Sequence, residues 1–371
     1  MTRLKRERKA LVGALLGATL GALLLLAPQA LGSTPRPCNG SSDLCGKTLG
    51  QAVSAGSHNS MSASDLGWTN PNQTWSIPTQ IKRGARVLLI DTYYGRTLPS
   101  GQVQNVPEVE GAADGATMYL CHSICVWGSS PLISELSKVA SFLRKNPREA
   151  IVVINQDSIT PDDFARAVDE SGLGRFLYRG SIARLPTLGR MIDRNQRVVM
   201  LAESDSGTVP WYHPAYEGAL IETPYSFATT AALTSPADLP ASCGPNRGGP
   251  DGAMFLMNHW VYDSTTAVPL IADARVVNTR EAITTRAKAC RAERGRMPNL
   301  IAVDFFGSGD VMGALWELNG TRPGWLIGNA EIRRMAVRAC RKKKGRARAR
   351  CTSAERRSLT RERARWARWG T

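Results

Sequence analysis

Two histidines, His58 and His122, are the side chains of this 371-residue sequence best suited to proton transfer near neutral pH. Imidazole has a pKa close to neutrality, so one ring can accept a proton while a second ring donates one. A carboxylate such as Asp304 beside the basic histidine would fix its tautomer and stabilise its cation. The combination suits attack by a hydroxyl group with simultaneous protonation of an alkoxide leaving group, which is the chemistry of phosphodiester cleavage.

Each of these residues lies at the end of a short apolar run that predicts a buried strand. Further runs end in Asp91, in residues 155–157 and in Glu203. In a barrel of parallel strands such ends converge where the βα loops meet, and reactive groups collect there. A lone strand-end histidine or carboxylate is usually structural, and Asp157 also fits a cap for the loop that follows. Agreement among these strand ends favours a functional site.

Oxygen donors near the histidines are suited to a metal ion. Asn59, Asp91 and Asp157 are hard oxygen donors that would suit a calcium ion holding a phosphate. Zinc is disfavoured because the sequence has four histidines and no C-x-x-C pair. No organic cofactor is expected.

Serine nucleophile chemistry has less support. No G-x-S-x-G stretch occurs, and the serines beside His58 are too close in sequence to form a triad. The glycine-rich segment 244–249 lacks the G-K-[ST] of a phosphate loop, so it is interpreted as a surface turn near Cys243.

Alternation of strands and helices predicts the fold class. Nearly continuous apolar character predicts strands that are covered on both faces. Helical periodicity and capping residues predict helices between the strands. This alternation indicates a parallel α/β fold, and of its two forms, a doubly wound sheet and a TIM-type (β/α)8 barrel, we expect the barrel. We expect this barrel to tolerate distortion and to have long insertions, the longest at residues 204–252. The predicted strands are 52–57, 87–91, 117–120, 150–155, 197–202, 254–258 and 300–306, and the predicted helices are 131–145, 161–173 and 279–293.

The formal net charge of +16 is concentrated at the two ends of the chain. Residues 331–371 carry 16 Lys and Arg against 3 acids, and residues 1–32 carry 5 against 1. The remainder is close to neutral, so the high isoelectric point says little about the ligand of the globular part. We divide the chain into a signal peptide at 1–32, a barrel at 33–330 and a basic C-terminal tail at 331–371.

The N-terminus has the features of a secretory signal. Basic residues precede an apolar run at 10–28, and small residues at Ala30 and Gly32 occupy the positions that a signal peptidase reads. Because the run is long, an uncleaved membrane anchor is the alternative. Export is the better interpretation.

All eight cysteines lie beyond the signal, and an even number in an exported chain predicts disulfides. The sequence does not fix their pairing. The simplest set joins 38 to 45, 121 to 125, 243 to 290 and 340 to 351.

The tail from 333 to 368 alternates basic runs with alanine and tryptophan. As an amphipathic helix it could make peripheral contact with an anionic membrane surface or another polyanion. Nucleic acid is a further alternative, although no specific nucleic acid is expected. A solvated or disordered terminus held by Cys340–Cys351 is the structural alternative. The oligomeric state stays open.

The strand-end motifs, taken in order, resemble the X-type catalytic domain of phosphatidylinositol-specific phospholipase C and the related PLC-like phosphodiesterases, in particular the secreted bacterial members. The likeness runs from about residue 48 to 320. It rests on AGSHNS, GARVLLIDTYYG, YLCHSIC, PREAIVVINQD and PNLIAVDFFGSGD.

The resemblance implies roles for the residues singled out above. His58 matches the general base that deprotonates the inositol 2-hydroxyl, and His122 matches the acid that protonates the leaving diacylglycerol oxygen. Asp304 matches the partner of the first histidine. The family's calcium-dependent members have an aspartate where this chain has Asp91, whereas the calcium-independent ones have arginine. Asn59, Asp91 and Asp157 therefore resemble part of a calcium set.

The family pattern is not complete. Calcium-dependent members place an acid two residues before the aspartate, where this chain has Leu89, so the metal site would lack one ligand. Arg96, Glu203 and Trp260 are candidates for substrate binding by position. The resemblance implies a secreted phosphodiesterase acting on a phospholipid, and the expected substrate is an inositol phospholipid or a glycosylated inositol lipid. The rival hypothesis is a non-catalytic secreted protein that binds a lipid or glycan on the same barrel.

Overall fold

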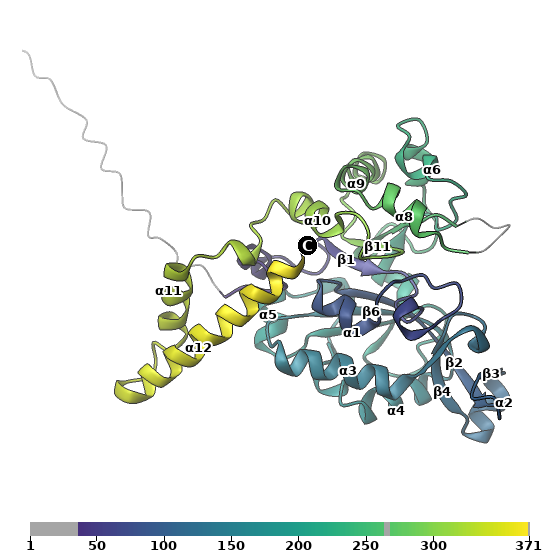
Figure 1. Ribbon diagram of the computed structural model, residues 1–371, viewed down its shortest axis with the longest axis horizontal. Helices are drawn as coiled ribbons and strands as arrows, with labels where there is room; N and C mark the ends of the chain where they lie inside the picture. The colour runs from purple at the N-terminus through teal and green to yellow at the C-terminus, as the bar shows by residue number, and fades with distance from the viewer. Residues whose placement is uncertain (1–35, 263–267, 370–371) are drawn as a thin grey trace, which may run out of the picture. The chain divides into compact units, whose positions relative to one another are not determined.

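The computed structural model describes residues 36–262 and 268–369, and residues 34–371 form one compact unit (Figure 1). The predicted signal peptide at 1–32 lies outside the described residues.

A curved sheet of parallel strands forms the core of this unit. Along the described chain, eight strands pair in the order β8-β7-β6-β2-β1-β11-β10-β9, and all neighbours in this series run parallel. The chain therefore winds once around a (β/α)8-type barrel, which confirms the predicted fold class. Pairing of the described strands stops between β8 and β9, which the turn at Ala215–Ala219 joins. The strands are β1 Ser54–Ser57, β2 Val87–Thr97, β6 Ile151–Ser158, β7 Val198–Ala202, β8 Tyr212–Pro214, β9 Leu220–Glu222, β10 Met254–His259 and β11 Leu300–Val303.

The barrel strands are apolar on both faces because side chains fill the barrel interior and helices cover its outside. Every residue of β7, β10 and β11 is buried. Such strands form by burial of apolar surface on two sides, at about 25 cal/mol per Å². The helices that follow the strands are α1 Ile77–Lys82, α3 Leu132–Lys145, α4 Pro161–Glu170, α5 Leu188–Asp193, α8 Ile271–Val277, α9 Arg280–Arg294 and α10 Val311–Asn319.

Local sequence sets the ends of these helices as predicted. Thr160 and Thr279 are the N-caps of α4 and α9, and each side chain accepts a hydrogen bond from the backbone N–H three residues on. Helix α3 ends before Asn146-Pro147, because a residue before proline disfavours helical backbone.

The predicted strand at 117–120 exists, but it is not a barrel strand. It is β4, Thr117–Cys121, and it runs antiparallel to the far end of β2. Strand β2 is longer than the predicted 87–91 and continues beyond the barrel, where it also pairs with β3, Val103–Val106. Helix α2, Glu108–Asp114, joins β3 to β4, and β5, Ser129–Pro131, pairs with β4. Apolar character alone does not distinguish a barrel strand from such a hairpin strand.

The insertion at 204–252 contains two barrel strands that the sequence did not reveal. Strands β8 and β9 have three residues each, too few to show a periodic pattern. Two short helices follow, α6 Ala231–Thr234 and α7 Leu239–Ser242, and the disulfide Cys243–Cys290 ties this segment to α9. All four predicted cysteine pairs are present, since Cys38–Cys45, Cys121–Cys125 and Cys340–Cys351 are also bonded.

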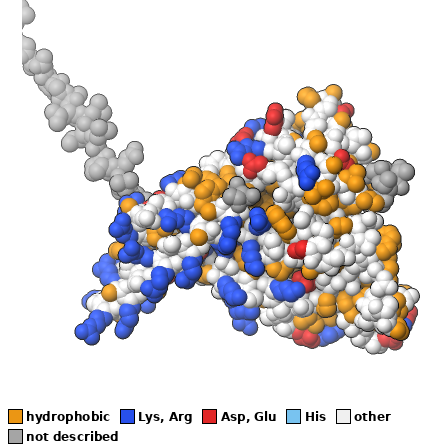
Figure 2. Space-filling model, viewed as in Figure 1, with side chains coloured by type: hydrophobic (Ala, Val, Ile, Leu, Met, Phe, Trp, Pro, Cys, Tyr) orange, Lys and Arg blue, Asp and Glu red, His pale blue; other side chains and the backbone are white. Residues whose placement is uncertain are grey.

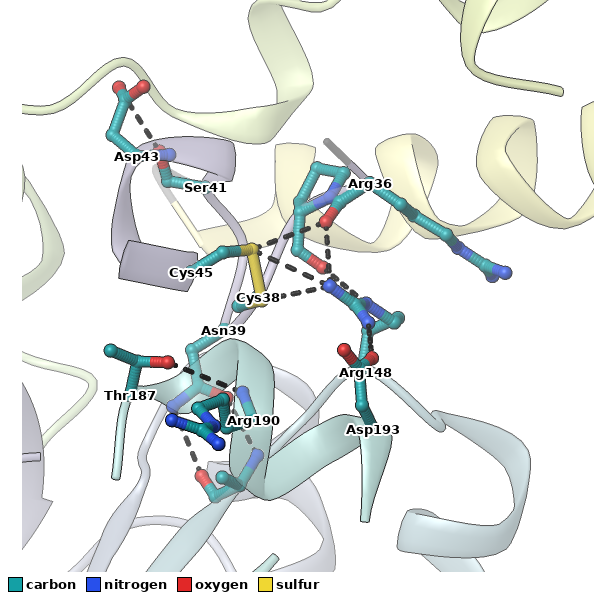
Figure 3. The surroundings of a disulfide bond; sticks show 12 residues. Arg36, Cys38, Asn39, Ser41, Asp43, Cys45, Arg148, Thr187, Arg190 and Asp193 are labelled. Atoms are coloured by element: carbon teal, nitrogen blue, oxygen red, sulfur yellow. Dashed lines mark hydrogen bonds and ion pairs between the residues drawn. A yellow bond between two sulfur atoms is a disulfide. The ribbon is translucent and has the colours of Figure 1, made fainter. Parts of the chain in front are cut away.

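An N-terminal loop closed by Cys38–Cys45 covers the amino-terminal edge of the sheet (Figure 3). The guanidinium of Arg148 lies 3.0 Å from the sulfur of Cys38. Asn39 exchanges two hydrogen bonds, of 2.7 and 3.1 Å, with the backbone of Ala150, the residue before β6. These contacts fasten the loop beside the start of β6.

The basic tail is an ordered helical hairpin. Helices α11, Asn329–Ala339, and α12, Gly345–Trp366, pack on each other, and Cys340–Cys351 joins them. Trp366 is fully buried and Trp369 is 5% exposed, so neither indole is available to a membrane. The alternative of a disordered terminus is wrong.

A buried ion-pair network fastens this hairpin to the barrel. Glu149, two residues before β6, accepts hydrogen bonds of 2.8 and 2.9 Å from Arg86 and one of 3.3 Å from the indole of Trp366. Arg365 of α12 pairs with the second oxygen of the same carboxylate. Along residues 36–262 and 268–369, no helix combines the length and apolar character needed to cross a bilayer.

Candidate active site

A cavity of about 350 Å³ opens among the carboxyl ends of the barrel strands. Most of the residues predicted for the site line it. They are His58, Asn59, Asp91, His122, Glu203, Trp260 and Asp304.

His58 and Asp304 form a pair at the ends of the adjacent strands β1 and β11. The His58 Nδ1 atom lies 2.9 Å from Asp304 Oδ1. Asn72 donates to both carboxylate oxygens at 3.2 and 3.3 Å, and Asp304 is 5% exposed. The Nδ1 proton of His58 points to the carboxylate, so Nε2 is left to exchange a proton with a substrate.

Two further residues fix the position of the His58 ring. Gln73 donates to the backbone carbonyls of His58 and Val303 at 2.7 and 3.0 Å, which clamps the two strand ends together. The indole of Trp260 is stacked on the imidazole, with ring centroids 3.7 Å apart and an interplanar angle of 4°. An aromatic face favours a cation, so this stack stabilises the protonated ring.

The backbone leaves the regular strand geometry immediately after each member of the pair. Asn59 has φ of 43° and Phe305 has φ of 44°. Both values lie in the left-handed region, which costs a non-glycine residue free energy and recurs at functional sites.

His122 reaches the cavity from the β2–β4 extension rather than from the barrel. The Asn59 amide lies 3.1 Å from His122 Nε2 and can donate to it, which would place the ring proton on Nδ1. The disulfide Cys121–Cys125 and a hydrogen bond of 2.9 Å from Asn105 to the Ser123 carbonyl hold the turn. Burial, with a smaller contribution from the charge of His58, lowers the pKa of His122 to about 4.

Opposite the histidines the cavity is acidic, with one arginine. Arg247 donates to Glu203 at 2.8 Å and to Glu222 at 2.6 Å. Asn258 donates to Glu222 at 3.1 Å. Burial, and secondarily the charge of Glu203, raises the pKa of Asp91 well above its usual value. This wall offers closely spaced donors and acceptors of the kind that bind hydroxyl groups.

The structure does not bring the predicted calcium ligands together. Asn59 and Asp91 line the cavity, whereas Asp157 accepts hydrogen bonds of 2.9 and 2.7 Å from the backbone N–H groups of Ser204 and Asp205. Strand β6 continues to Ser158, so its side chains still alternate between two faces at residues 156 and 157. Gln156 therefore faces the cavity and Asp157 does not. Among the residues that the structure describes, no three His, Cys, Asp or Glu side chains could hold a metal ion together.

Arg96 also lies outside the cavity. It belongs to the part of β2 that extends beyond the barrel, is exposed, and lies 3.6 Å from Glu110 and from Asp114 of α2. The prediction placed it near the site because it assumed that β2 ends at Asp91.

Several residues of the site were not found from the sequence. Glu222 ends a strand that is too short to recognise, and Arg247 lies in the glycine-rich segment that was interpreted as a surface turn. Asn258 could have been found, because it ends the predicted strand 254–258 as the other polar residues end theirs. Asn72 and Gln73 lie in a loop without a motif.

Comparison with known proteins identifies the family of this chain. The model of the PI-PLC X family matches residues 44–319. The chain belongs to the PI-PLC X family.

Its relatives include two proteins of the fungus Arthroderma benhamiae. An uncharacterized secreted protein is 28% identical over 302 residues, which cover 76% of this chain and 63% of the relative. A PI-PLC X domain-containing protein 1 is 25% identical over 320 residues, which cover 81% of this chain and 96% of the relative. The chain thus spans less than two thirds of the length of the first relative. Among solved structures, phosphatidylinositol-specific phospholipase C from Staphylococcus aureus has a TM-score of 0.49 at 16% identity, over 75% of this chain and 94% of that one.

Proposed function

We propose that this PI-PLC X protein is an exported phosphodiesterase that cleaves an inositol phospholipid or a glycosylated inositol lipid. The observation that carries the proposal is the juxtaposition of the His58–Asp304 pair with His122 across one cavity. A binding protein needs a shaped cavity, but it does not need a base with an orienting carboxylate opposite a second imidazole.

The proposed reaction uses each histidine once. His58 Nε2 takes the proton of a substrate hydroxyl as its oxygen bonds to phosphorus. The bond from phosphorus to the lipid alkoxide oxygen breaks, and protonated His122 donates its proton to that oxygen. The products are a cyclic phosphodiester and the lipid alcohol. Asp304 and the face of Trp260 stabilise the His58 cation that forms.

His122 must be protonated to act as the acid, although the pKa of the free protein's His122 is lowered to about 4. A phosphodiester anion between the rings supplies the missing negative charge and favours the imidazolium. Substrate binding would in this way prepare the acid.

The opposite wall supports a polyhydroxylated head group. Glu203, Glu222 and Arg247 form a fixed array of acceptors and donors, in which one guanidinium is paired with both carboxylates. Buried polar groups of this kind bind hydroxyls selectively, because a ligand without hydroxyls would leave them unpaired.

The sequence predicts a calcium ion, but the steps of the proposed reaction use only side chains of the protein. Asp157 is occupied by backbone N–H groups, and the carboxylate of Glu203 is paired with Arg247. Measuring turnover with and without EDTA tests the metal separately from the histidines.

Peripheral membrane contact would come from the rim of the cavity rather than from the basic tail. Exposed apolar side chains follow the carboxyl ends of the strands on both sides of the opening, at exposures of 38% to 54%. Such a patch suits contact with a lipid surface. The rim comprises Ile124, Trp127, Tyr225, Tyr262, Leu270 and Ile271.

Two observations that do not depend on the N-terminal residues support export. The four disulfides require an oxidising compartment, and one relative is a secreted protein.

The deciding experiment compares His58→Ala with wild type on phosphatidylinositol vesicles and on a chromogenic phosphodiester. We expect the substitution to lower kcat by about 10² to 10⁴-fold. His213→Ala is the matched control, since His213 lies in β8 and does not line the cavity. Absence of turnover by the folded wild-type protein would favour the rival binding function. Leu89 supports that rival, because it stands where calcium-dependent members of the family have an acid. Full activity of His58→Ala would refute the mechanism.

A further inference from the structure

The α11–α12 hairpin carries a concentration of positive charge that the proposed function does not use. Residues 331–371 contain 13 Arg and 3 Lys against 3 acids. Figure 2 shows Lys and Arg gathered over this hairpin, whereas the rest of the visible face is mixed. Its acids are already engaged, since Glu355 and Glu362 pair with Arg36.

The positive charge is displayed on a fixed frame. Helix α12 has 22 residues and is therefore about 33 Å long. Cys340–Cys351 fixes it to α11, and the buried Trp366 and Glu149 fix it to the barrel.

Two shallow grooves on the hairpin are lined by arginines. One, of about 350 Å³, lies between the helices and includes Arg333, Arg334, Arg341 and Arg348. The other, of about 540 Å³, runs along α12 and is lined by Ser353, Arg356, Arg357, Thr360 and Arg361. All seven of these arginines are exposed.

The position of the hairpin argues against the substrate membrane as its partner. Trp366 contacts Glu149, just before β6 begins. Trp369 contacts the carbonyl of Lys82, a few residues before β2 begins. The cavity lies at the opposite ends of the strands. In Figure 1 the hairpin lies on the left and the β2–β4 extension on the right. If the cavity faces a bilayer, as the proposed function requires, the hairpin points away from that bilayer.

The chemistry of the hairpin favours a stiff phosphate polymer. Guanidinium groups bind phosphate oxygens through paired hydrogen bonds, and arginine outnumbers lysine here. A rigid array about 33 Å long matches one turn of duplex DNA, about 34 Å. A flexible polyanion would lose conformational entropy on aligning with it, whereas a duplex is already straight over this length.

We propose that the α11–α12 hairpin is a binding surface for double-stranded nucleic acid. It contacts the phosphate backbone without reading the base sequence, and it leaves the cavity open while the duplex is bound.

The test is fluorescence anisotropy with a duplex of about 20 base pairs, two helical turns, over a range of salt concentrations. Replacing Arg333, Arg334, Arg341 and Arg348 with glutamine should weaken binding at least tenfold. It should also reduce the slope of log K against log salt by about 3 to 4, one released counterion for each lost contact. Replacing Arg356, Arg357 and Arg361 with glutamine gives a second, independent variant. It should also weaken binding at least tenfold, and it should reduce the slope by about 2 to 3 because it removes three contacts.

The matched control replaces four exposed arginines on the barrel, Arg175, Arg179, Arg190 and Arg194, and should retain wild-type affinity. Equal losses in the control and hairpin variants, or no duplex binding by the wild type, would overturn the proposal. So would tighter binding of anionic vesicles or heparin than of the duplex through the same arginines. His58→Ala should bind the duplex as wild type does. The duplex-binding test and the activity assay can therefore succeed or fail independently.

Discussion

The two histidines are held by different means, and this difference agrees with the roles proposed for them. His58 has a carboxylate on Nδ1, a stacked indole on its face and a clamped backbone. His122 has one amide partner and a turn closed by a disulfide. A ring with a buried carboxylate is a better base, whereas a ring without one holds a proton less tightly and donates it more readily.

Asp304→Asn tests the role of the carboxylate. The amide keeps the shape of the side chain but removes the negative charge that stabilises the His58 cation. We expect kcat to fall by about 10³ to 10⁴-fold, as for the orienting aspartate of a catalytic triad. Asp162→Asn, on the exposed first turn of α4, is the control and should leave kcat unchanged. Equal activity of both variants would remove Asp304 from the mechanism.

The charge state of His122 can be followed by histidine NMR. In the free protein it should titrate near its lowered pKa of about 4, so it is neutral at pH 6 to 7. Binding of a non-cleavable phosphodiester should raise this pKa, because the anion favours the imidazolium. His58→Gln should also raise it by removing a neighbouring cation. A His122 signal that titrates near 6.5 with and without ligand would contradict both statements.

At the scale of elements, the site depends on one strand that outgrows the barrel. Strand β2 continues to Thr97 and carries β4 antiparallel beside it, and this returns His122 over the cavity. Strands β1 and β11 pair in parallel register and place His58 beside Asp304. The His58–Asp304 pair is thus built on the barrel, and the second histidine on an extension.

The attachment of the α11–α12 hairpin depends on Glu149. Burial raises its pKa, but Arg86 and Arg365 outweigh this and lower it. Glu149→Gln leaves two guanidinium groups buried without their counterion and should lower the free energy of unfolding by about 3 to 5 kcal/mol. Urea denaturation measures this. Glu355→Gln, in a partly exposed ion pair, should cost less than about 1 kcal/mol.

The pH dependence of this stabilisation follows from the sign of the shift. Because the folded-state pKa of Glu149 is lowered, the stabilisation is complete above the ordinary value of 4.5 and declines as the pH falls through the folded-state value. The Glu149→Gln variant should lose less stability than wild type over this acid range. An equal loss in both proteins would show that other carboxylates dominate.

At the scale of the whole molecule, the two ends of the barrel differ in chemistry. The carboxyl end of the sheet has the cavity and its apolar rim, whereas the Cys38–Cys45 loop and the hairpin contact the amino end. Under the proposed function, the end with the cavity would meet a lipid surface while the other end remains in solvent.

Trp127→Ala tests this orientation. Trp127 is 49% exposed on the rim, and its loss should weaken vesicle binding several-fold while turnover of a soluble diester stays unchanged. Leu326→Ala, at an apolar position 53% exposed beside the hairpin, is the control and should bind vesicles as wild type does. Equal weakening in both variants would contradict the proposed orientation, as would a Trp127→Ala variant that binds normally.

The sequence by itself determined much of this protein. Apolar runs, caps and the residue before a proline are local signals, so seven strand positions and three helices were predicted correctly. The four cysteine pairs are the simplest of the pairings that the sequence left open. His58, His122 and Asp304 could be named because each lies in or directly after a recognisable apolar run and because the motifs that contain them resemble those of a known family.

Only the tertiary structure decided which of the other polar residues reach the cavity. The side chains of a strand alternate between two faces, so an unpredicted extension of β6 or β2 moves Asp157 or Arg96 out of the site. Arg247 and Glu222 come from a glycine-rich turn and a three-residue strand, where the sequence has no period. The basic tail likewise became an ordered hairpin because Glu149, far away in sequence, pairs with Arg365 and contacts Trp366. Contacts between distant segments are absent from local sequence, and they place the residues that complete the site.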